Sequence, residues 1–312
     1  MNETLLKNLY SDCTLCPRTC HSDRYTGTGF CGAGAEIKLA RAALHLWEEP
    51  CLIGDPEHPS GAGAIFFSHC NLKCLFCQNY NISSGGFGKT VTTQQLADIM
   101  LRLESEGAAC IDLVTATHYI PSVVSALDLV RHRLSIPVIF NCGGYESIEA
   151  LKLLDGYIDI YLPDLKYYSD EPAVRYSAAP RYFETALAAV KEMIRQTGDP
   201  VFANAAEAPN APLVRGVIIR HMVLPGCRKD SIALLDRLAE EPGTKHFLLS
   251  LMSQYTPFFH AAEHPEINRR LTSFEYDSVL DHAVALGFQG YMQEKSSAKE
   301  EYTPSFDLEG VY

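Results

Sequence analysis

Short apolar runs alternate with longer amphipathic segments from about residue 61 onward. The apolar runs have the length of buried β-strands, and the segments between them have the period of helices. This alternation indicates parallel strands joined by right-handed helical crossovers. The predicted strands are 64–67, 111–114, 138–140, 158–162, 217–223 and 247–251. The predicted helices are 93–106, 121–133, 147–154, 180–197, 231–240 and 274–286.

About six strand–helix units predict an α/β fold, an open (β/α)6 barrel of the TIM type that is shorter than the eight-unit closed form. Thr92 or Thr93 can cap the first helix, and Gly107 follows the end of that helix. Ligand sites in parallel α/β folds gather at the carboxyl ends of the strands. We therefore expect functional residues directly after the predicted strands.

The first 60 residues are dense in cysteine, glycine and proline and show no convincing period. This composition is typical of a loop-rich cap or a small metal-binding subdomain. We expect two parts in the chain, a Cys-rich N-terminal extension at 1–60 and a partial barrel with a C-terminal tail at 61–312.

Composition and charge exclude several classes of protein. Hydrophobic residues make up 47% of the chain and charged residues 21%, as in a globular protein with a real core. The net charge of -12 argues against nonspecific binding to nucleic acid, which requires a basic surface. No run approaches the ~20 apolar residues of a membrane span, and the N-terminus does not have the pattern of a signal peptide. We expect a cytoplasmic protein without nucleic-acid or membrane partners.

The chain has 11 cysteines, seven of which fall into two tight groups. In a reducing cytoplasm such groups bind metal more often than they form disulfides. Cys70, Cys74 and Cys77 follow the first predicted barrel strand. They could face the core of a helix, but the polar residues between them make poor core neighbours.

Three thiolates on one loop can hold three irons of a four-iron cluster and leave the fourth iron open. An open metal position marks a catalytic site. Zinc fits less well, because a structural zinc site needs a fourth ligand and His69 is too close to Cys70 in sequence to supply it without strain.

The C-x3-C-x2-C spacing, with Phe76 before the last cysteine, resembles the signature of the radical S-adenosylmethionine (SAM) superfamily. The resemblance implies a 4Fe–4S cluster whose open iron chelates SAM. It also implies one-electron cleavage of SAM to methionine and a 5′-deoxyadenosyl radical, which takes a hydrogen atom from a substrate. The protein binds and orients SAM and shields the radical, while the cofactor supplies the chemistry.

Longer strings resemble proteins related to pyruvate formate-lyase activating enzyme, in the group called PflX-like. These strings lie at 48–51, 61–67, 77–83, 161–166, 220–226, 251–255 and 306–310. The resemblance implies activation of a glycyl-radical enzyme, with flavodoxin or ferredoxin as the reductant.

The same resemblance assigns residues to the SAM and substrate pocket. Asp164 and Lys166 match an Asp-x-Lys motif, and His221 matches a histidine before a Val-x-Pro-Gly turn. Lys166 can pair with a carboxylate, and Asp164 can hold that lysine. The alternatives are a solvated strand end for Asp164 and Lys166, and a satisfied core histidine for His221.

Further cofactor contacts are expected after the second and third predicted strands. Thr115 and Thr117 stand where the superfamily usually has a Gly-Gly-Glu-like segment, and their hydroxyl groups could accept the same hydrogen bonds. Asn141 follows the third strand beside two glycines that would let the backbone approach a ligand. Cys142 is interpreted as an inert thiol, because nothing cationic adjoins it in sequence.

The N-terminal cysteines, Cys13, Cys16, Cys20 and Cys31, form the second group. Four thiolates complete a closed site, which could hold zinc or an iron–sulfur cluster. Their compact C-x2-C-x3-C run is reminiscent of cluster loops. Such a site could stabilise a loop-rich region, relay electrons or help to dock substrate.

The leading hypothesis is a radical SAM oxidoreductase that takes a hydrogen atom from a substrate and activates a glycyl-radical enzyme. The alternative within the same class is modification of another protein or of a small molecule. The alternative of a different class is a non-catalytic metal-binding or electron-transfer protein, and the missing fourth ligand at Cys70, Cys74 and Cys77 speaks against it.

Overall fold

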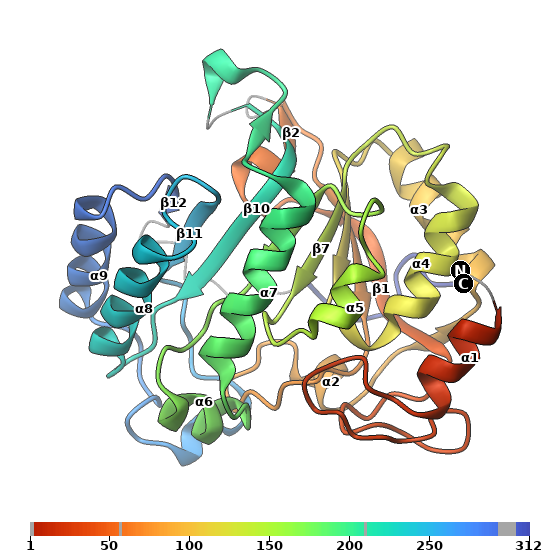
Figure 1. Ribbon diagram of the computed structural model, residues 1–312, viewed down its shortest axis with the longest axis horizontal. Coiled ribbons are helices and arrows are strands. Elements are labelled where there is room, and N and C mark those ends of the chain that lie inside the picture. The colour runs from red at the N-terminus through yellow and green to blue at the C-terminus, as the bar shows by residue number, and fades with distance from the viewer. Residues whose placement is uncertain (1–2, 56–57, 209–210, 293–303) are drawn as a thin grey trace.

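The structure, a computed structural model, describes residues 3–55, 58–208, 211–292 and 304–312. Within these residues one large twisted sheet has the strand order β12-β11-β10-β8-β7-β6-β4-β1-β5, with β9 paired to β10 (Figure 1). Its strands are β1 (Ile37–His45), β4 (Ala62–Phe67), β5 (Lys89–Val91), β6 (Ile111–Val114), β7 (Val138–Cys142), β8 (Ile160–Pro163), β9 (Val201–Phe202), β10 (Leu213–Met222), β11 (Leu248–Met252) and β12 (Gly290–Met292). A separate pair is formed by β2 (Gly54–Asp55) and β3 (His58–Pro59).

Helices connect most of the parallel strands. They are α1 (Glu3–Ser11), α2 (Tyr80–Ser83), α3 (Thr93–Ser105), α4 (Ile120–Val130), α5 (Ile148–Lys152), α6 (Asp170–Ser177), α7 (Tyr182–Thr197), α8 (Arg228–Glu240) and α9 (Ser273–Ala285). The start of α3 is a capping box, because the Thr92 hydroxyl accepts from the Gln95 amide and the Gln95 side chain accepts from the Thr92 amide. No helix of the described chain is both long and apolar enough to cross a membrane.

The predicted partial α/β barrel is confirmed. The six predicted strands correspond to β4, β6, β7, β8, β10 and β11, which pair in parallel in that order. A seventh parallel strand, β12, extends the sheet beyond β11.

The strand β1 was not predicted, although it pairs antiparallel with β4 along most of its length. Its register shifts between Leu39 and Arg41, so the alternation of buried and exposed residues is interrupted where a strand pattern is sought. The division of the chain at residue 60 stays a prediction, while β1 belongs to the main sheet.

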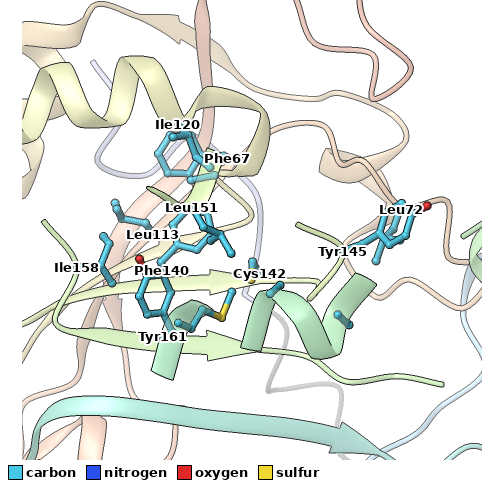
Figure 2. Close-up of a cluster of buried hydrophobic side chains, with 14 of the residues drawn as sticks. Phe67, Leu72, Leu113, Ile120, Phe140, Cys142, Tyr145, Leu151, Ile158 and Tyr161 are labelled. Carbon is cyan, nitrogen blue, oxygen red and sulfur yellow. The ribbon is translucent and has the colours of Figure 1, made fainter. Parts of the chain in front are cut away.

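The core forms where successive parallel strands place large side chains next to each other. Leu113 pairs with Phe140, and Phe140 with Tyr161, on adjacent strands β6, β7 and β8. All three are fully buried, and Leu151 of α5 packs with them (Figure 2). Helices cover the faces of a parallel sheet in this way, which leaves the strand ends to carry polar residues.

The two ends of the chain pack onto the barrel. The N-terminal loops, red in Figure 1, lie at the same end of the molecule as α2 and α6. The Tyr10 hydroxyl group hydrogen-bonds that of Ser122 in α4 at 2.8 Å. At the other end of the chain, the Leu308 amide donates to Ala40 of β1, and the Phe306 ring meets the Phe66 ring edge-on.

Candidate active site

A cavity of about 580 Å³ lies at the carboxyl ends of the parallel strands. Its walls include eight residues that the sequence predicted for the site. They are Cys70, Cys74, Phe76, Cys77, Thr115, Asn141, Asp164 and Lys166. Residues from β4, β6, β7 and β8 thus meet at one place, as expected for this fold class.

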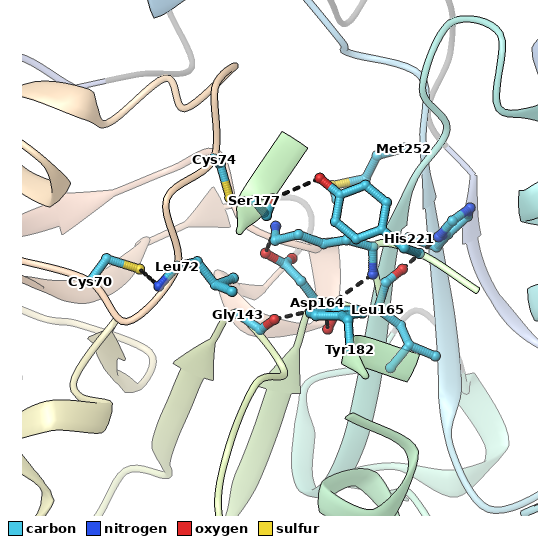
Figure 3. Close-up of polar contacts among 12 residues, drawn as sticks. Cys70, Leu72, Cys74, Gly143, Asp164, Leu165, Ser177, Tyr182, His221 and Met252 are labelled. Atoms are coloured by element: carbon cyan, nitrogen blue, oxygen red, sulfur yellow. Dashed lines mark hydrogen bonds and ion pairs between the residues drawn. The ribbon is translucent and has the colours of Figure 1, made fainter. Parts of the chain in front are cut away.

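Thr117 and His221 lie outside this cavity wall. The Thr117 hydroxyl group donates to Glu146 at 2.9 Å, and the threonine is almost fully buried. The Nδ1 atom of His221 is 2.6 Å from the carbonyl oxygen of Leu165. Figure 3 shows the His221 ring turned away from Cys70 and Cys74. Cofactor contact by these two residues stays a prediction.

Each sulfur of the cluster loop, residues 70–77, has a hydrogen-bonding neighbour. Cys70 Sγ accepts from the Leu72 amide at 3.4 Å, and Cys74 Sγ accepts from the Ser177 hydroxyl group at 3.0 Å. Cys77 Sγ lies 3.3 Å from the Ser83 hydroxyl oxygen. Burial, followed by the nearby Cys74, raises the pKa of Cys77 to about 11, so a metal has to displace this proton.

Lys166 supplies a positive charge beside these sulfurs. Its Nζ lies 2.5 Å from Asp164 Oδ2. Burial by itself disfavours the ammonium ion, but Asp164 and then Cys74 outweigh it and raise the pKa of Lys166. The lysine is therefore protonated at physiological pH.

Tyr182 of α7 fixes the backbone that carries this ion pair. Its hydroxyl oxygen accepts from the Lys166 amide at 3.1 Å and lies 2.9 Å from the carbonyl oxygen of Asp164 (Figure 3). The same hydroxyl group lies 2.8 Å from the carbonyl oxygen of Gly143, in the loop after β7. One buried tyrosine thus ties two strand ends together under the cavity.

The residues present fit an iron–sulfur cluster better than a single metal ion. Within the described ranges, no three Cys, His, Asp or Glu side chains are placed to hold one ion. A four-iron cluster binds each thiolate at a different iron, so its ligands lie further apart than those of one ion. Three thiols, their hydrogen-bond donors and the Lys166 ammonium group suit an anionic cluster with one open iron.

Two cavity residues adopt strained backbone conformations at strand ends. His69 has φ 76° after β4, and Thr115 has φ 62° after β6. Positive φ is costly for a β-branched residue and marks positions that the surrounding structure forces. Burial, followed by Lys38 and Lys73, lowers the pKa of His69 to about 4, so its ring is neutral near pH 7.

Sequence reasoning did not assign the charged group on another part of the cavity wall. Arg220 of β10 donates from Nε to Glu49 at 2.8 Å and pairs with Glu48 as well. Burial opposes ionisation of Glu49, but Arg220 outweighs it and holds the pKa of that carboxyl group below its usual value. The sequence did contain a signal for this group. Arg220 interrupts an apolar strand, and Glu48 and Glu49 are adjacent in a loop, so an ion pair between them could have been proposed.

The N-terminal cysteines lie in the loops that pack against the cluster loop. Arg18 Nε donates to the carbonyl oxygen of Asn71 at 2.9 Å, and Lys73 Nζ donates to that of Cys31 at 3.5 Å. Burial raises the pKa of Cys16 to about 12, and Cys13 is among the neighbours that raise it further.

Comparison with known proteins identifies the family. The model of the Radical SAM superfamily matches residues 64–239, which include the cluster loop and more than half of the chain. The chain therefore belongs to the radical SAM superfamily. Membership implies a 4Fe–4S cluster and SAM as co-substrate, and it supports an enzyme over a purely structural metal-binding protein.

A relative from Methanocaldococcus jannaschii, the uncharacterised protein MJ0674, is 30% identical over 293 residues, which cover 89% of this chain and 76% of that protein. Among solved structures, SuiB of Streptococcus suis bound to S-adenosylmethionine aligns with a TM-score of 0.50 at 12% identity, over 76% of this chain and 51% of that one. Methylornithine synthase (PylB) aligns with a TM-score of 0.49 at 15% identity, and the alignment covers 93% of this chain and 74% of that protein. The chain spans about half the length of SuiB.

Proposed function

We propose that Cys70, Cys74 and Cys77 hold the catalytic 4Fe–4S cluster and that SAM is cleaved in the cavity beside Lys166. The observation that carries this proposal is the meeting of three hydrogen-bonded thiols and a half-buried, ion-paired lysine in one cavity at the carboxyl ends of parallel strands. When bound, the cluster supplies one electron that cleaves the sulfonium of SAM to methionine and a 5′-deoxyadenosyl radical.

The residues of the chain bind and orient the co-substrate. Lys166 pairs with the carboxylate of SAM, and Asp164 holds the lysine in place through their ion pair. Apolar side chains of Leu72, Phe76 and Met252 complete the wall and exclude water from the site. A radical formed there is shielded from side reactions until it meets the substrate.

We further propose that the substrate hydrogen belongs to a glycine of a partner protein, which would make this chain an activating enzyme. The strings shared with activating enzymes support this class of substrate. The cavity wall also includes Trp47 and Met292, whose exposed fractions of 52% and 43% place apolar surface where a protein partner could contact it. Flavodoxin or ferredoxin would supply the electron.

The test of SAM cleavage uses anaerobically reconstituted protein with dithionite and SAM. We expect release of 5′-deoxyadenosine, and Cys74→Ala should abolish it. Cys227→Ala is the matched control, because Cys227 lies outside both cysteine groups and outside the cavity wall. An absence of release, with an absorption spectrum that SAM leaves unchanged, would contradict the proposal.

The substrate is tested with glycyl-radical enzymes whose glycines carry deuterium at Cα. The hydrogen balance requires that each deuterium lost from glycine appears in 5′-deoxyadenosine. Deuterium in the product, together with a radical signal on the partner, is the expected result. Unlabelled product and no partner radical would favour modification of another protein or a small molecule.

A further inference from the structure

Arg24 is a fully buried cation in the N-terminal loops, with 1% of its surface exposed. Its Nε donates to the carbonyl oxygen of Ala33 at 3.2 Å, and its Nη2 donates to that of Gly34 at 2.5 Å. Its Nη1 donates to the carbonyl oxygen of His118, in the barrel. The guanidinium group is therefore held firmly in one position by backbone oxygens.

The charge of Arg24 has no carboxylate partner in the part of the chain that the structure describes. Its guanidinium lies over the rings of Tyr10 and Tyr119, at 4.5 and 5.5 Å from their centroids. A cysteine sulfur is also near, because Cys13 Sγ lies 3.9 Å from Nη1. A buried charge without a counter-charge destabilises the folded state, so a negative charge on the thiols would stabilise this arrangement.

Cys20 and Cys31 lie close to each other, beside the Arg24 side chain. A Cβ atom built on Gly29 would lie 3.4 Å from Cys20 Sγ and 3.4 Å from Cys31 Sγ, so these two sulfurs are separated by at most twice that distance. The Ala33 amide also donates to Cys31 Sγ at 3.5 Å. Glycine at position 29 keeps the space between the sulfurs open.

We propose that Cys13, Cys16, Cys20 and Cys31 bind a second 4Fe–4S cluster and that Arg24 balances its charge. A 4Fe–4S core of charge 2+ with four thiolates carries a net charge of about -2, which a buried arginine stabilises. A single zinc ion would need the sulfurs within one tight tetrahedron, and the described residues hold no such group of three.

With four protein ligands, this second cluster has no open iron and cannot chelate SAM. Its loop lies against the cluster loop, because a Cβ atom on Gly32 would lie 2.9 Å from His69 Nδ1. This position suits an electron carrier. If both clusters are bound, the second could accept one electron from an external one-electron donor and pass it to the first, which would return the second cluster to its oxidised state.

The experiment compares iron and sulfide in reconstituted wild type, the double variant Cys13→Ala/Cys16→Ala, and Cys227→Ala. We expect about eight irons in wild type and Cys227→Ala, and about four in the double variant. Cys20→Ser, at the least buried of the four positions, gives the same comparison if the double variant does not fold. Four irons in every variant, or loss of zinc in place of iron, would overturn the proposal.

A second measurement tests Arg24. Removal of its charge in Arg24→Gln should shift the midpoint potential of the second cluster to a lower value, while Arg24→Lys should keep it near that of wild type. Equal potentials in all three proteins would show that Arg24 does not balance a cluster. Release of 5′-deoxyadenosine by the double variant with dithionite reports separately on the first cluster, so failure of one site is distinguishable from failure of the other.

Discussion

At the scale of single residues, the sulfurs of the cluster loop differ in the donors that face them. Cys70 Sγ accepts a hydrogen bond from the backbone amide of Leu72. Cys74 Sγ and Cys77 Sγ instead contact the hydroxyl groups of Ser177 and Ser83. Hydrogen bonds to sulfur stabilise the reduced, more negative form of a cluster. With the proposed cluster bound, the hydroxyl groups of Ser177 and Ser83 would therefore make it easier to reduce.

Ser177→Ala should lower the midpoint potential of the catalytic cluster, because Cys74 loses its donor. A neutral hydrogen bond is worth about 1 kcal/mol, which corresponds to about 40 mV for a one-electron couple. Redox titration followed by electron paramagnetic resonance measures the shift. Ser125→Ala is the control, since the Ser125 hydroxyl group bonds to its own helix. An unchanged potential would show that the Ser177 hydroxyl group does not face the cluster.

Lys166→Met should weaken SAM binding about tenfold to a hundredfold, because a charge-assisted hydrogen bond worth about 1.5–3 kcal/mol is lost. Equilibrium dialysis of labelled SAM with the reconstituted protein measures the change. Lys152→Met, at an exposed position in α5, should bind as wild type does. Wild-type affinity in Lys166→Met would place the carboxylate of SAM elsewhere.

At the scale of elements, the site depends on how closely the ends of β7 and β8 approach. Gly144 follows β7 with φ 77°, and a Cβ atom there would lie 2.1 Å from the carbonyl oxygen of Asp164. A side chain at this position would displace the backbone that carries Asp164 and Lys166. The glycine is therefore required by contact as well as by backbone conformation.

Gly144→Ala should reduce both stability and SAM affinity more than Gly156→Ala does. Gly156 has φ 83°, but a Cβ atom added there would meet no atom within 4 Å, so its replacement carries only the cost of positive φ, about 1 kcal/mol. Urea unfolding and SAM binding of the two variants isolate the effect of the steric clash. Equal losses of stability and SAM affinity in Gly144→Ala and Gly156→Ala would contradict this prediction. They would show that the loops after β7 and β8 can move apart without affecting the site.

The six central parallel strands and the longer helices after residue 61 could be predicted, because strands buried on both faces of a sheet appear in the sequence as continuous apolar runs. The short strands β5, β9 and β12 and the helices α2 and α6 were not predicted, because they leave no such run. It was harder to predict which face of the sheet the side chain of each strand residue lies on. His221 matched a motif, yet its neighbour Arg220 lines the cavity, because adjacent residues of a strand point to opposite faces. Whether Arg220 or His221 lines the cavity depends on the register in which β10 pairs with β8. This register cannot be derived from the sequence alone.

At the scale of the whole molecule, Glu146 is buried where the N-terminal loops meet the barrel. The Thr117 hydroxyl group donates to it, and its charge acts on Cys16. Burial raises the pKa of Glu146 to about 7. The folded protein thus keeps a proton that the unfolded chain releases near pH 4.5.

Because the folded state binds more protons in this window, Glu146 makes the free energy of unfolding fall as pH rises from 4.5 to 7. The loss is about 3 kcal/mol. Glu146→Gln should remove this part of the pH dependence, as measured by urea unfolding at several pH values. Glu149→Gln, on the exposed face of α5, should keep the wild-type slope. Parallel curves for Glu146→Gln and wild type would contradict the assignment.

The packing of the C-terminal residues onto β1 has a consequence for the order of folding. Arg41 reaches the carbonyl oxygen of Ser305 across 264 positions of sequence, and Pro304 is part of the cavity wall. Contacts of such separation form late, because a very long loop has to close first. During synthesis, the wall beside β1 stays incomplete until residues 304–305 have left the ribosome, so assembly of the site awaits translation of this segment.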